Sequence, residues 1–325
     1  MGTVLVLAAG TAFAGITVLV NRYGSGIATG NLLGDAGNKG ATLRGPLDIL
    51  LVGSDYRKNP ELKGSLWRAD TVMVLHVPRT HDKAYLLSLS RDLMVDIPES
   101  DNGKWPGGED KLNAAFVHGG NGAGGYRLLA KTLSRLMDID FDSGAVIDFY
   151  GFVKVVEVLG GVDLCIETPK GRDTLKSIHP PYRTFKKGCR HYDGHAALDY
   201  VRQRKQFVDG DHARMRHQQE FLKALLVQAR NQGVHRDLGK LDRLIRAAGS
   251  SLTIDDSIPV ADLGFTLRKI RPEDLTAIEV PSEGRSEGTW YAELVDPADS
   301  LFEAVRDDSL DDWVSKHPRY VNELT

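Results

Sequence analysis

Arginine, aspartate and glutamine side chains gather in one stretch of this chain, in a pattern that favours a phosphate-bearing ligand. The stretch lies between residues 200 and 219 and contains Arg202, Arg204, Asp211, Arg214 and Gln218. Arg202 and Arg204, two apart on an extended segment, point the same way. The other three, spaced by three and four, share one side of a helix. Guanidinium forks match phosphate oxygens, and a helix N-terminus attracts anions, so the pattern predicts an anion site. The alternative is a solvated, charged helix.

A second group of chemically useful side chains comes from the ends of two predicted strands. Asp55 follows an apolar run at 47–53, and Asp70 begins a second run at 70–77. The basic residues beside them are Arg57 and Arg68. Two carboxylates at one end of a sheet offer the hard oxygen ligands that Mg²⁺ prefers. The alternative for each aspartate is a helix cap or an Asx turn.

A third group follows the apolar run at 84–89, where Arg91 and Asp92 stand directly after the strand. Lys111 and Asn113 face one direction if their segment is extended. Each group alone has a simpler explanation, such as a surface ion pair. Together, two aspartates, several arginines and a lysine indicate a magnesium–diphosphate site, with hard oxygen ligands for the metal and a positive cage for the phosphates.

The apolar runs that carry these groups predict the class of fold. They lack polar alternation, which is typical of strands that are covered on both faces, so helices should sandwich the sheet. Helical spacing of apolar residues predicts helices over 125–137, 149–159 and 212–230. The length of 325 residues and the 42% apolar fraction are those of an ordinary globular protein.

Several functional classes are excluded or disfavoured. A net charge of −3 gives no global reason to bind nucleic acid. The sequence contains no P-loop, no His–Cys cluster with metal-ligand spacing and no GxSxG elbow for a serine nucleophile. Nucleotide hydrolysis by a P-loop and serine-based acyl transfer are therefore unsupported.

The N-terminal segment predicts a membrane anchor. Residues 3–20 form an uncharged run of apolar and small residues, which as a helix would cover ~27 Å, just short of a bilayer core. We therefore assign 1–23 to one transmembrane helix, either a short span or one clipped at its front; a cleavable signal segment is the alternative. Residues 24–46, rich in Gly, Asn and Ala, are expected to be a linker. Arg22 by itself favours a cytoplasmic location for the residues after the span.

The polar groups occur in strings that form an ordered set between residues 47 and 230. The strings are DILLVGSD, WRADT, SLSRD, KLNAA, FVKVVEVLGGVD and YVRQRK followed by DHARMRHQQ. In this order they resemble the LytR-CpsA-Psr (LCP) family of bacterial cell-envelope proteins. The resemblance implies a three-layer α/β/α sandwich with a central mixed sheet and a hydrophobic pocket for a polyprenyl chain. It places the catalytic domain at 47–232 and leaves 233–325 as a C-terminal extension packed on or following it.

The same resemblance implies an activity. It is the Mg²⁺-dependent transfer of a glycopolymer phosphate from a polyprenyl diphosphate carrier to peptidoglycan, by a single-pass protein of the cytoplasmic membrane whose catalytic domain is extracellular. Asp55 and Asp70 would bind the metal. The residues expected to hold or surround the diphosphate are Arg68, Arg91, Asp92, Arg202, Arg204, Asp211, Arg214 and Gln218, and Arg57, Lys111 and Asn113 are expected to contact substrate. Asp92 and Asp211 are candidates for a general base, but orienting arginines is the better interpretation.

In an extracellular location, the two cysteines could form a disulfide. A bridge between Cys165 and Cys189 would close a loop of about 25 residues and stabilise it by ~3 kcal/mol. Two unrelated reduced thiols are the alternative.

Two other functions fit the same residues. The site could release the phosphorylated glycan to water, as a polyprenyl-diphosphate phosphohydrolase, because water and a sugar hydroxyl are similar nucleophiles. A non-catalytic module that binds lipid carriers and regulates envelope assembly is the third interpretation. The polymer transferred and the oligomeric state are beyond the sequence.

Overall fold

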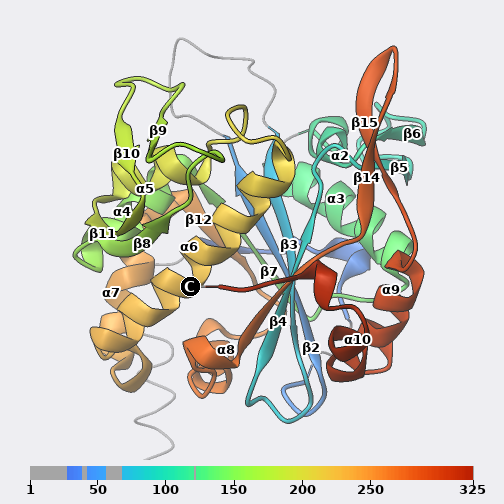
Figure 1. The fold of residues 1–325 in the computed structure, drawn as a ribbon. Coiled ribbons are helices and arrows are strands. Elements are labelled where there is room, and N and C mark those ends of the chain that lie inside the picture. Colours follow the sequence, from blue (N-terminus) through green and yellow to red (C-terminus); the bar gives the residue numbers. More distant parts are fainter. Residues whose placement is uncertain (1–27, 39–41, 56–67, 121, 325) are drawn as a thin grey trace, which may run out of the picture.

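An eight-stranded mixed sheet forms the centre of the molecule (Figure 1). The structure, a computed structural model, describes residues 28–38, 42–55, 68–120 and 122–324. In spatial order the strands are β1 (Ala28–Gly30), β12 (Leu252–Asp255), β7 (Ser143–Asp148), β2 (Leu47–Ser54), β3 (Ala69–Val77), β4 (Ala84–Leu89), β13 (Leu275–Glu279) and β16 (Val321–Asn322). Three neighbouring pairs are parallel, namely β1 with β12, β7 with β2 and β4 with β13, and the other four are antiparallel.

The central strands arise from the apolar runs that the sequence analysis identified. β2, β3 and β4 match the predicted runs to within one residue at each end. Leu50 and Val52 of β2 face one core, whereas Leu47 and Ile49 face another, which explains why the run has no polar alternation. Both faces of the sheet are therefore covered.

Helices on the two faces complete a three-layer α/β/α sandwich, as expected. One face carries α2 (Leu112–His118), α3 (Gly122–Met137), α9 (Ala298–Arg306) and α10 (Leu310–Lys316). The other carries α4 (Phe149–Val158), α5 (Gly194–Val201), α6 (Asp211–Asn231), α7 (Leu238–Ala248) and α8 (Val260–Leu267). Outside the sheet lie two short pairs, β5 (Met94–Ile97) with β6 (Gly108–Lys111) and β14 (Ser282–Glu287) with β15 (Thr289–Leu294).

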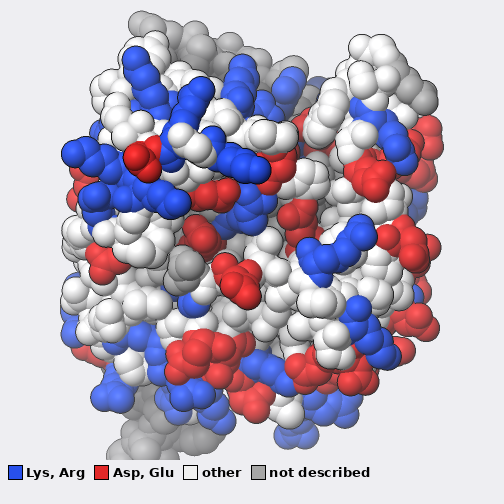
Figure 2. Space-filling view, in the orientation of Figure 1, with Lys and Arg blue, Asp and Glu red and all other residues white. Residues whose placement is uncertain are grey.

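A small lobe packs beside α5 and α6 and holds two further strand pairs. They are β8 (Val162–Ile166) with β11 (Gly188–Tyr192), and β9 (Thr174–Lys176) with β10 (Thr184–Lys186). β8 pairs with β11 and lies outside the central sheet. In the space-filling view, Lys and Arg side chains gather over this lobe, at the upper left (Figure 2).

The expected disulfide is confirmed. Cys165 and Cys189 stand directly opposite each other in the β8–β11 pair, with a Cα–Cα distance of 3.8 Å, and their sulfur atoms are bonded. The bridge closes a loop with a sequence separation of 24 residues that contains the whole β9–β10 hairpin.

Removing this bridge should destabilise the protein. A bridge that closes a loop of this length restricts the unfolded chain. We therefore expect the double variant Cys165→Ala/Cys189→Ala to lose about 3 kcal/mol of unfolding free energy. Urea unfolding, compared with the wild type in oxidised and reduced form, measures the loss. Equal stabilities of the wild type with and without reductant would contradict it.

Two segments differ from the expected organisation. The segment 24–46 is expected to be a linker, but its residues 28–38 pack into the fold. Leu32 and Leu33 are buried in the main core, and the carboxylate of Asp255 accepts both of their backbone N–H groups, at 2.8 and 3.1 Å. The region after residue 232 supplies β12, β13 and β16, so the end of the proposed catalytic domain does not coincide with an edge of the sheet.

The predicted anchor at 1–23 lies outside the described residues. Within the described ranges, no helix has the length and apolar character needed to cross a bilayer.

Candidate functional site

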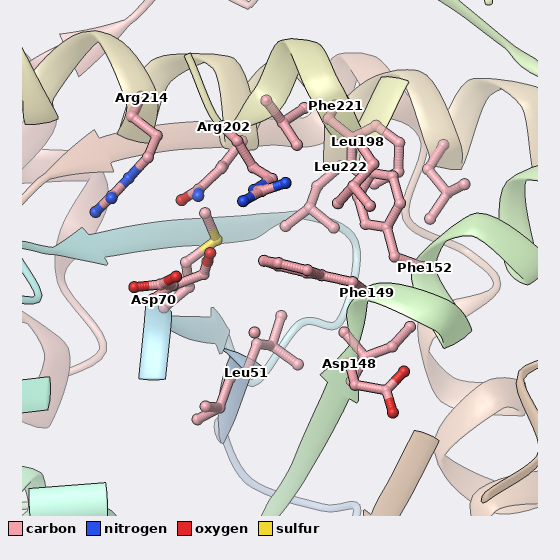
Figure 3. A pocket seen from close by; sticks show the side chains of 18 of the residues that line it. Leu51, Asp70, Asp148, Phe149, Phe152, Leu198, Arg202, Arg214, Phe221 and Leu222 are labelled. Atoms are coloured by element: carbon pink, nitrogen blue, oxygen red, sulfur yellow. The ribbon is translucent and has the colours of Figure 1, made fainter. Parts of the chain in front are cut away.

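A pocket of about 360 Å³ lies between the sheet and helices α4, α5 and α6. Its floor is formed by β2, β3 and β7, and its walls by side chains of the three helices. Figure 3 shows that the two ends of this pocket differ: Asp70, Arg202 and Arg214 lie toward one end, and the other is lined mostly by apolar side chains, with Asp148 at its edge.

The polar end brings together six of the predicted site residues. They are Asp70, Arg91, Arg202, Arg204, Arg214 and Gln218. Their elements are far apart in sequence: the start of β3, the segment after β4, the segment after α5, and the first two turns of α6. This is the arrangement expected of ligand sites in α/β folds, where residues after different strands and at helix N-termini converge.

Arg91 is held in place by two carboxylates. Its Nη1 donates to Asp70, and its Nε lies 3.6 Å from Asp92 Oδ2. Burial opposes the charge of Arg91, but Asp70, Asp211 and Asp92 outweigh it and raise the pKa of the guanidinium. Arg91 therefore carries its positive charge at neutral pH.

The N-terminus of α6 presents a second buried arginine. Gly210, with φ +52°, turns the chain into the helix, a conformation that a residue with a side chain rarely adopts. Arg214 Nη2 pairs with Asp211 Oδ1 at 2.8 Å, and Arg204 Nη1 lies 3.5 Å from the same oxygen. Arg214 is only 5% exposed, and burial lowers its pKa to about 10, so it is charged at neutral pH yet poorly hydrated.

Four guanidinium groups thus face two carboxylates, Asp70 and Asp211, around the polar end of the pocket. The buried Nε atoms of Arg91 and Arg214 have no hydrogen-bond partner among the described residues. Four positive charges against two negative ones leave a net positive charge at this end of the pocket, which attracts an anion. The electrostatics therefore favour a ligand with several negative oxygens.

The other end of the pocket is apolar and was not predicted residue by residue. It is lined by Phe149, Phe152, Val155, Leu198, Phe221, Leu222, Leu225 and Leu252. Phe149 also carries the guanidinium of Arg202 on its ring, with Cζ 4.5 Å from the centroid, so the two ends meet there. An elongated apolar group joined to an anionic group would match both ends.

The remaining predicted site residues lie around the pocket or away from it. Lys111 Nζ bonds Asp92 Oδ1 at 3.1 Å, and the backbone N–H of buried Asn113 donates to the carbonyl of Arg91 at 2.9 Å. Both support the Arg91 segment without lining the pocket. The side chain of Arg68 is exposed and also does not line it, and Arg57 lies outside the described residues.

The two predicted metal ligands occupy neighbouring strand ends. The backbone N–H of Asp55 donates to the carbonyl of Arg68 at 3.2 Å, and Asp55 Oδ1 accepts from the backbone N–H of Arg68 at 2.8 Å, two residues before Asp70. Within the described part of the chain, no group of three or more His, Cys, Asp or Glu side chains forms a metal cluster. Two carboxylates fit Mg²⁺, which commonly takes only one or two protein carboxylates and completes its shell with phosphate oxygens and water.

Comparison with known proteins establishes the family. The model of the LytR_cpsA_psr family matches residues 28–304, and the chain therefore belongs to this family.

Two curated relatives and one solved structure give points of reference. The probable cell wall biosynthesis protein LcpB of Corynebacterium glutamicum is 38% identical over 194 residues, which are 57% of this chain and 42% of LcpB. The polyisoprenyl-teichoic acid–peptidoglycan teichoic acid transferase TagV of Bacillus subtilis is 28% identical over 243 residues, 72% of this chain and 58% of TagV. The structure of TagT bound to LI-WTA superimposes with a TM-score of 0.64 at 23% identity, over 84% of this chain and 95% of that one.

The aligned part thus spans about half the length of these curated relatives, and the structural likeness supports the fold.

Proposed function

We propose that this protein transfers a glycopolymer phosphate from a polyprenyl diphosphate carrier to peptidoglycan, outside the cytoplasmic membrane. The observation that carries the proposal is the two-ended pocket, whose apolar body suits a polyprenyl chain and whose arginine-lined end suits a diphosphate. The name of TagV gives a polyisoprenyl-linked teichoic acid and peptidoglycan, which correspond to the donor and acceptor proposed here.

In the proposed reaction a sugar hydroxyl of the acceptor attacks the phosphorus that carries the glycopolymer. A new P–O bond forms to the acceptor, the P–O bond to the bridging oxygen breaks, and polyprenyl phosphate leaves with the electron pair. Arg91, Arg204 and Arg214 would neutralise the charge that builds up on the leaving group and on the phosphoryl oxygens.

The proton of the attacking hydroxyl passes to water or to the departing polyprenyl phosphate, and no strong base is needed because phosphoryl transfer has a loose transition state. Asp92 pairs with Arg91 and Lys111, and Asp211 pairs with Arg204 and Arg214. Both carboxylates are thus engaged with cations, which supports a role in orienting the arginines.

A magnesium ion, held by Asp55 and Asp70 in this proposal, would supply Lewis-acid neutralisation of the diphosphate.

Product analysis tests the function directly. The full chain is incubated with a synthetic polyprenyl diphosphate-linked saccharide and Mg²⁺, with and without peptidoglycan, and the products are identified by mass spectrometry. Acceptor-linked sugar phosphate together with polyprenyl phosphate is expected. Free sugar phosphate, whether or not acceptor is present, would show a phosphohydrolase instead. Tight donor binding without any turnover would show a regulatory module.

Filling the apolar body of the pocket should discriminate between donors. Replacing Leu222 by tryptophan places an indole where the lipid chain would lie, so we expect KM for a long-chain donor to rise about tenfold and that for a short-chain donor to change less. The control is Phe265→Trp, at an exposed position on α8. Equal effects of Leu222→Trp on both donors would show that the lipid chain does not bind at this end of the pocket.

A further inference from the structure

Four exposed large hydrophobic side chains stand within a few sequence positions of residues that line the pocket. Among the large hydrophobic residues that stand exposed are Tyr150 (56%), Ile178 (40%), Tyr182 (57%) and Val208 (105%). Tyr150 follows the pocket-lining Phe149, and Ile178 and Tyr182 flank the pocket-lining His179 in the β9–β10 turn. Val208 stands between the pocket-lining Arg204 and the start of α6.

The β9–β10 turn holds its exposed residues rigidly. At its base, Ser177 Oγ donates to Asp199 Oδ1 at 2.6 Å and accepts from Gln203 Nε2 at 2.9 Å, and all three side chains are buried. The disulfide ties the same lobe together. Ile178 and Tyr182 are therefore presented to the surface by a fixed scaffold, where their exposure costs free energy unless they meet a partner.

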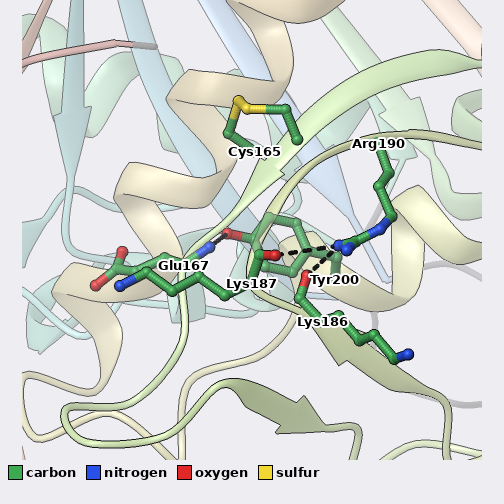
Figure 4. Close-up of a disulfide and its surroundings, with 7 residues drawn as sticks. Cys165, Glu167, Lys186, Lys187, Arg190 and Tyr200 are labelled. Atoms are coloured by element: carbon green, nitrogen blue, oxygen red, sulfur yellow. Dashed lines mark hydrogen bonds between the residues drawn. A yellow bond between two sulfur atoms is a disulfide. The ribbon is translucent and has the colours of Figure 1, made fainter.

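Basic side chains accompany Ile178 and Tyr182 in the same segment of the small lobe. From residue 167 to 190 the sequence has seven Lys or Arg and two Asp or Glu, although the whole chain has a net charge of −3. The exposed members are Lys170, Arg172, Lys176, Lys186, Lys187 and Arg190. Figure 2 shows the resulting concentration of basic side chains over the lobe, and Figure 4 shows Arg190 reaching the backbone of Lys186 and Lys187, with the Lys186 side chain extending away from the disulfide. Arg190 donates to the backbone carbonyls of Lys186 and Lys187, which fixes its place.

We propose that this rim surface, made of the four exposed apolar residues and the six exposed basic ones named above, docks on an anionic lipid bilayer. Tyrosine favours the level of the lipid headgroups, and lysine and arginine pair with anionic headgroups while aliphatic side chains enter the acyl boundary. The proposal rests on the proposed function in one respect. If the pocket takes a polyprenyl chain, a pocket mouth that faces the bilayer gives direct access to the membrane-embedded donor.

A soluble polyanion, such as a phosphate-rich glycan, would also be attracted by the basic side chains. It would leave Tyr150, Ile178, Tyr182 and Val208 in water, whereas a bilayer covers them. The mixture of exposed apolar and basic side chains therefore favours the bilayer.

A local fluorescence measurement tests the docking. The full chain is labelled with an environment-sensitive dye at a Tyr182→Cys substitution, and separately at Phe265→Cys, an exposed hydrophobic position on α8 that lies at the opposite end of the molecule (Figure 1). The native cysteines stay bonded to each other. With vesicles of phosphatidylglycerol and phosphatidylcholine we expect a blue shift at position 182 and none at 265. The readout is local, so it does not depend on how any other part of the chain meets the bilayer.

Three results would overturn the proposal. They are no shift at position 182 with the anionic vesicles, equal shifts at both positions, and a shift at 182 produced by soluble polyglycerol phosphate but not by vesicles. The last would assign the rim surface to a polyanion.

Transfer kinetics separate this proposal from the proposed function. The variant Lys186→Glu/Lys187→Glu should lose about tenfold in transfer from a donor embedded in anionic vesicles and retain its rate with a short-chain donor in detergent. The control Arg243→Glu/Lys269→Glu reverses two exposed charges on the α7–α8 side and should leave both rates unchanged. Equal rates of the two variants with vesicles would contradict the docking. Absence of transfer by the wild type would contradict the function alone, because the fluorescence result stands without it.

Discussion

Replacing Arg214 by glutamine is expected to lower the rate of glycopolymer transfer by about a thousandfold, the loss typical of removing one preorganised charge from a phosphoryl-transfer site. Arg214 is 5% exposed, lines the polar end of the pocket and is oriented by Asp211. Its charge is already stripped of water in the folded protein, so little reorganisation is needed when a diphosphate arrives. The rate is measured with the polyprenyl diphosphate-linked donor under saturating acceptor.

Arg216 supplies a matched control on the same helix. It pairs with Asp209 and Glu167 on the side of α6 away from the pocket and does not line it. Arg216→Gln should therefore keep transfer within about threefold of the wild type. Arg214→Lys distinguishes charge from shape: a lysine keeps the charge but loses the planar fork, so only partial recovery is expected. If Arg214→Gln and Arg216→Gln transfer at similar rates, Arg214 does not contribute to the reaction.

The polar end of the pocket was predictable from the sequence because its residues stand at element ends. Asp70 begins a strand, Arg91 follows one, and Arg214 lies in the first turn of a helix, and these are the places where α/β folds assemble sites. Helical spacing also selected the glutamine that lines the pocket. Gln218 lines the pocket, whereas its neighbour Gln219 is buried against β4 and β13 and donates to Ser88 Oγ at 2.8 Å.

The apolar end could not be predicted in the same way. Phe149, Phe152 and Phe221 have the helical spacing of ordinary core residues, and nothing local reveals that the space between them is left open. Whether an apolar face meets another element or a cavity depends on the distance between helices, which is set by long-range contacts. In this protein α4 and α6 are joined through the small lobe, so their separation is not encoded near either helix.

The position of the C-terminal strands in the sheet could not be predicted from the sequence either. β13 pairs in parallel with β4, its neighbour in space but nearly two hundred positions away in sequence, and β12 has only four residues. Short strands carry little periodic signal, and their partners are chosen by the edges that the rest of the sheet leaves unpaired. The segment at 28–38 was missed for a related reason: its Gly-rich composition indicated a linker, but Leu32 and Leu33 bury against a partner, Asp255, that lies more than two hundred residues later in the chain.

Replacing Asp70 by asparagine is expected to lower transfer about a hundredfold and to abolish its response to Mg²⁺. The proposal gives this carboxylate two tasks, to orient Arg91 and to bind the metal, and only the second predicts a changed metal dependence. Rates are measured against Mg²⁺ concentration after treatment with a chelator, which should itself stop transfer until Mg²⁺ is restored.

Asp92 allows the two tasks of Asp70 to be separated. It also lies against Arg91, with a separation of 3.6 Å, but does not line the pocket. Asp92→Asn should therefore lower the rate while leaving the Mg²⁺ concentration for half-maximal activity unchanged. Asp55→Ala should instead raise that concentration, because Asp55 stands at the neighbouring strand end as the second proposed ligand of the metal. If Asp70→Asn behaves like Asp92→Asn, with a slower rate and an unaltered Mg²⁺ curve, Asp70 is a partner of Arg91 and not a metal ligand.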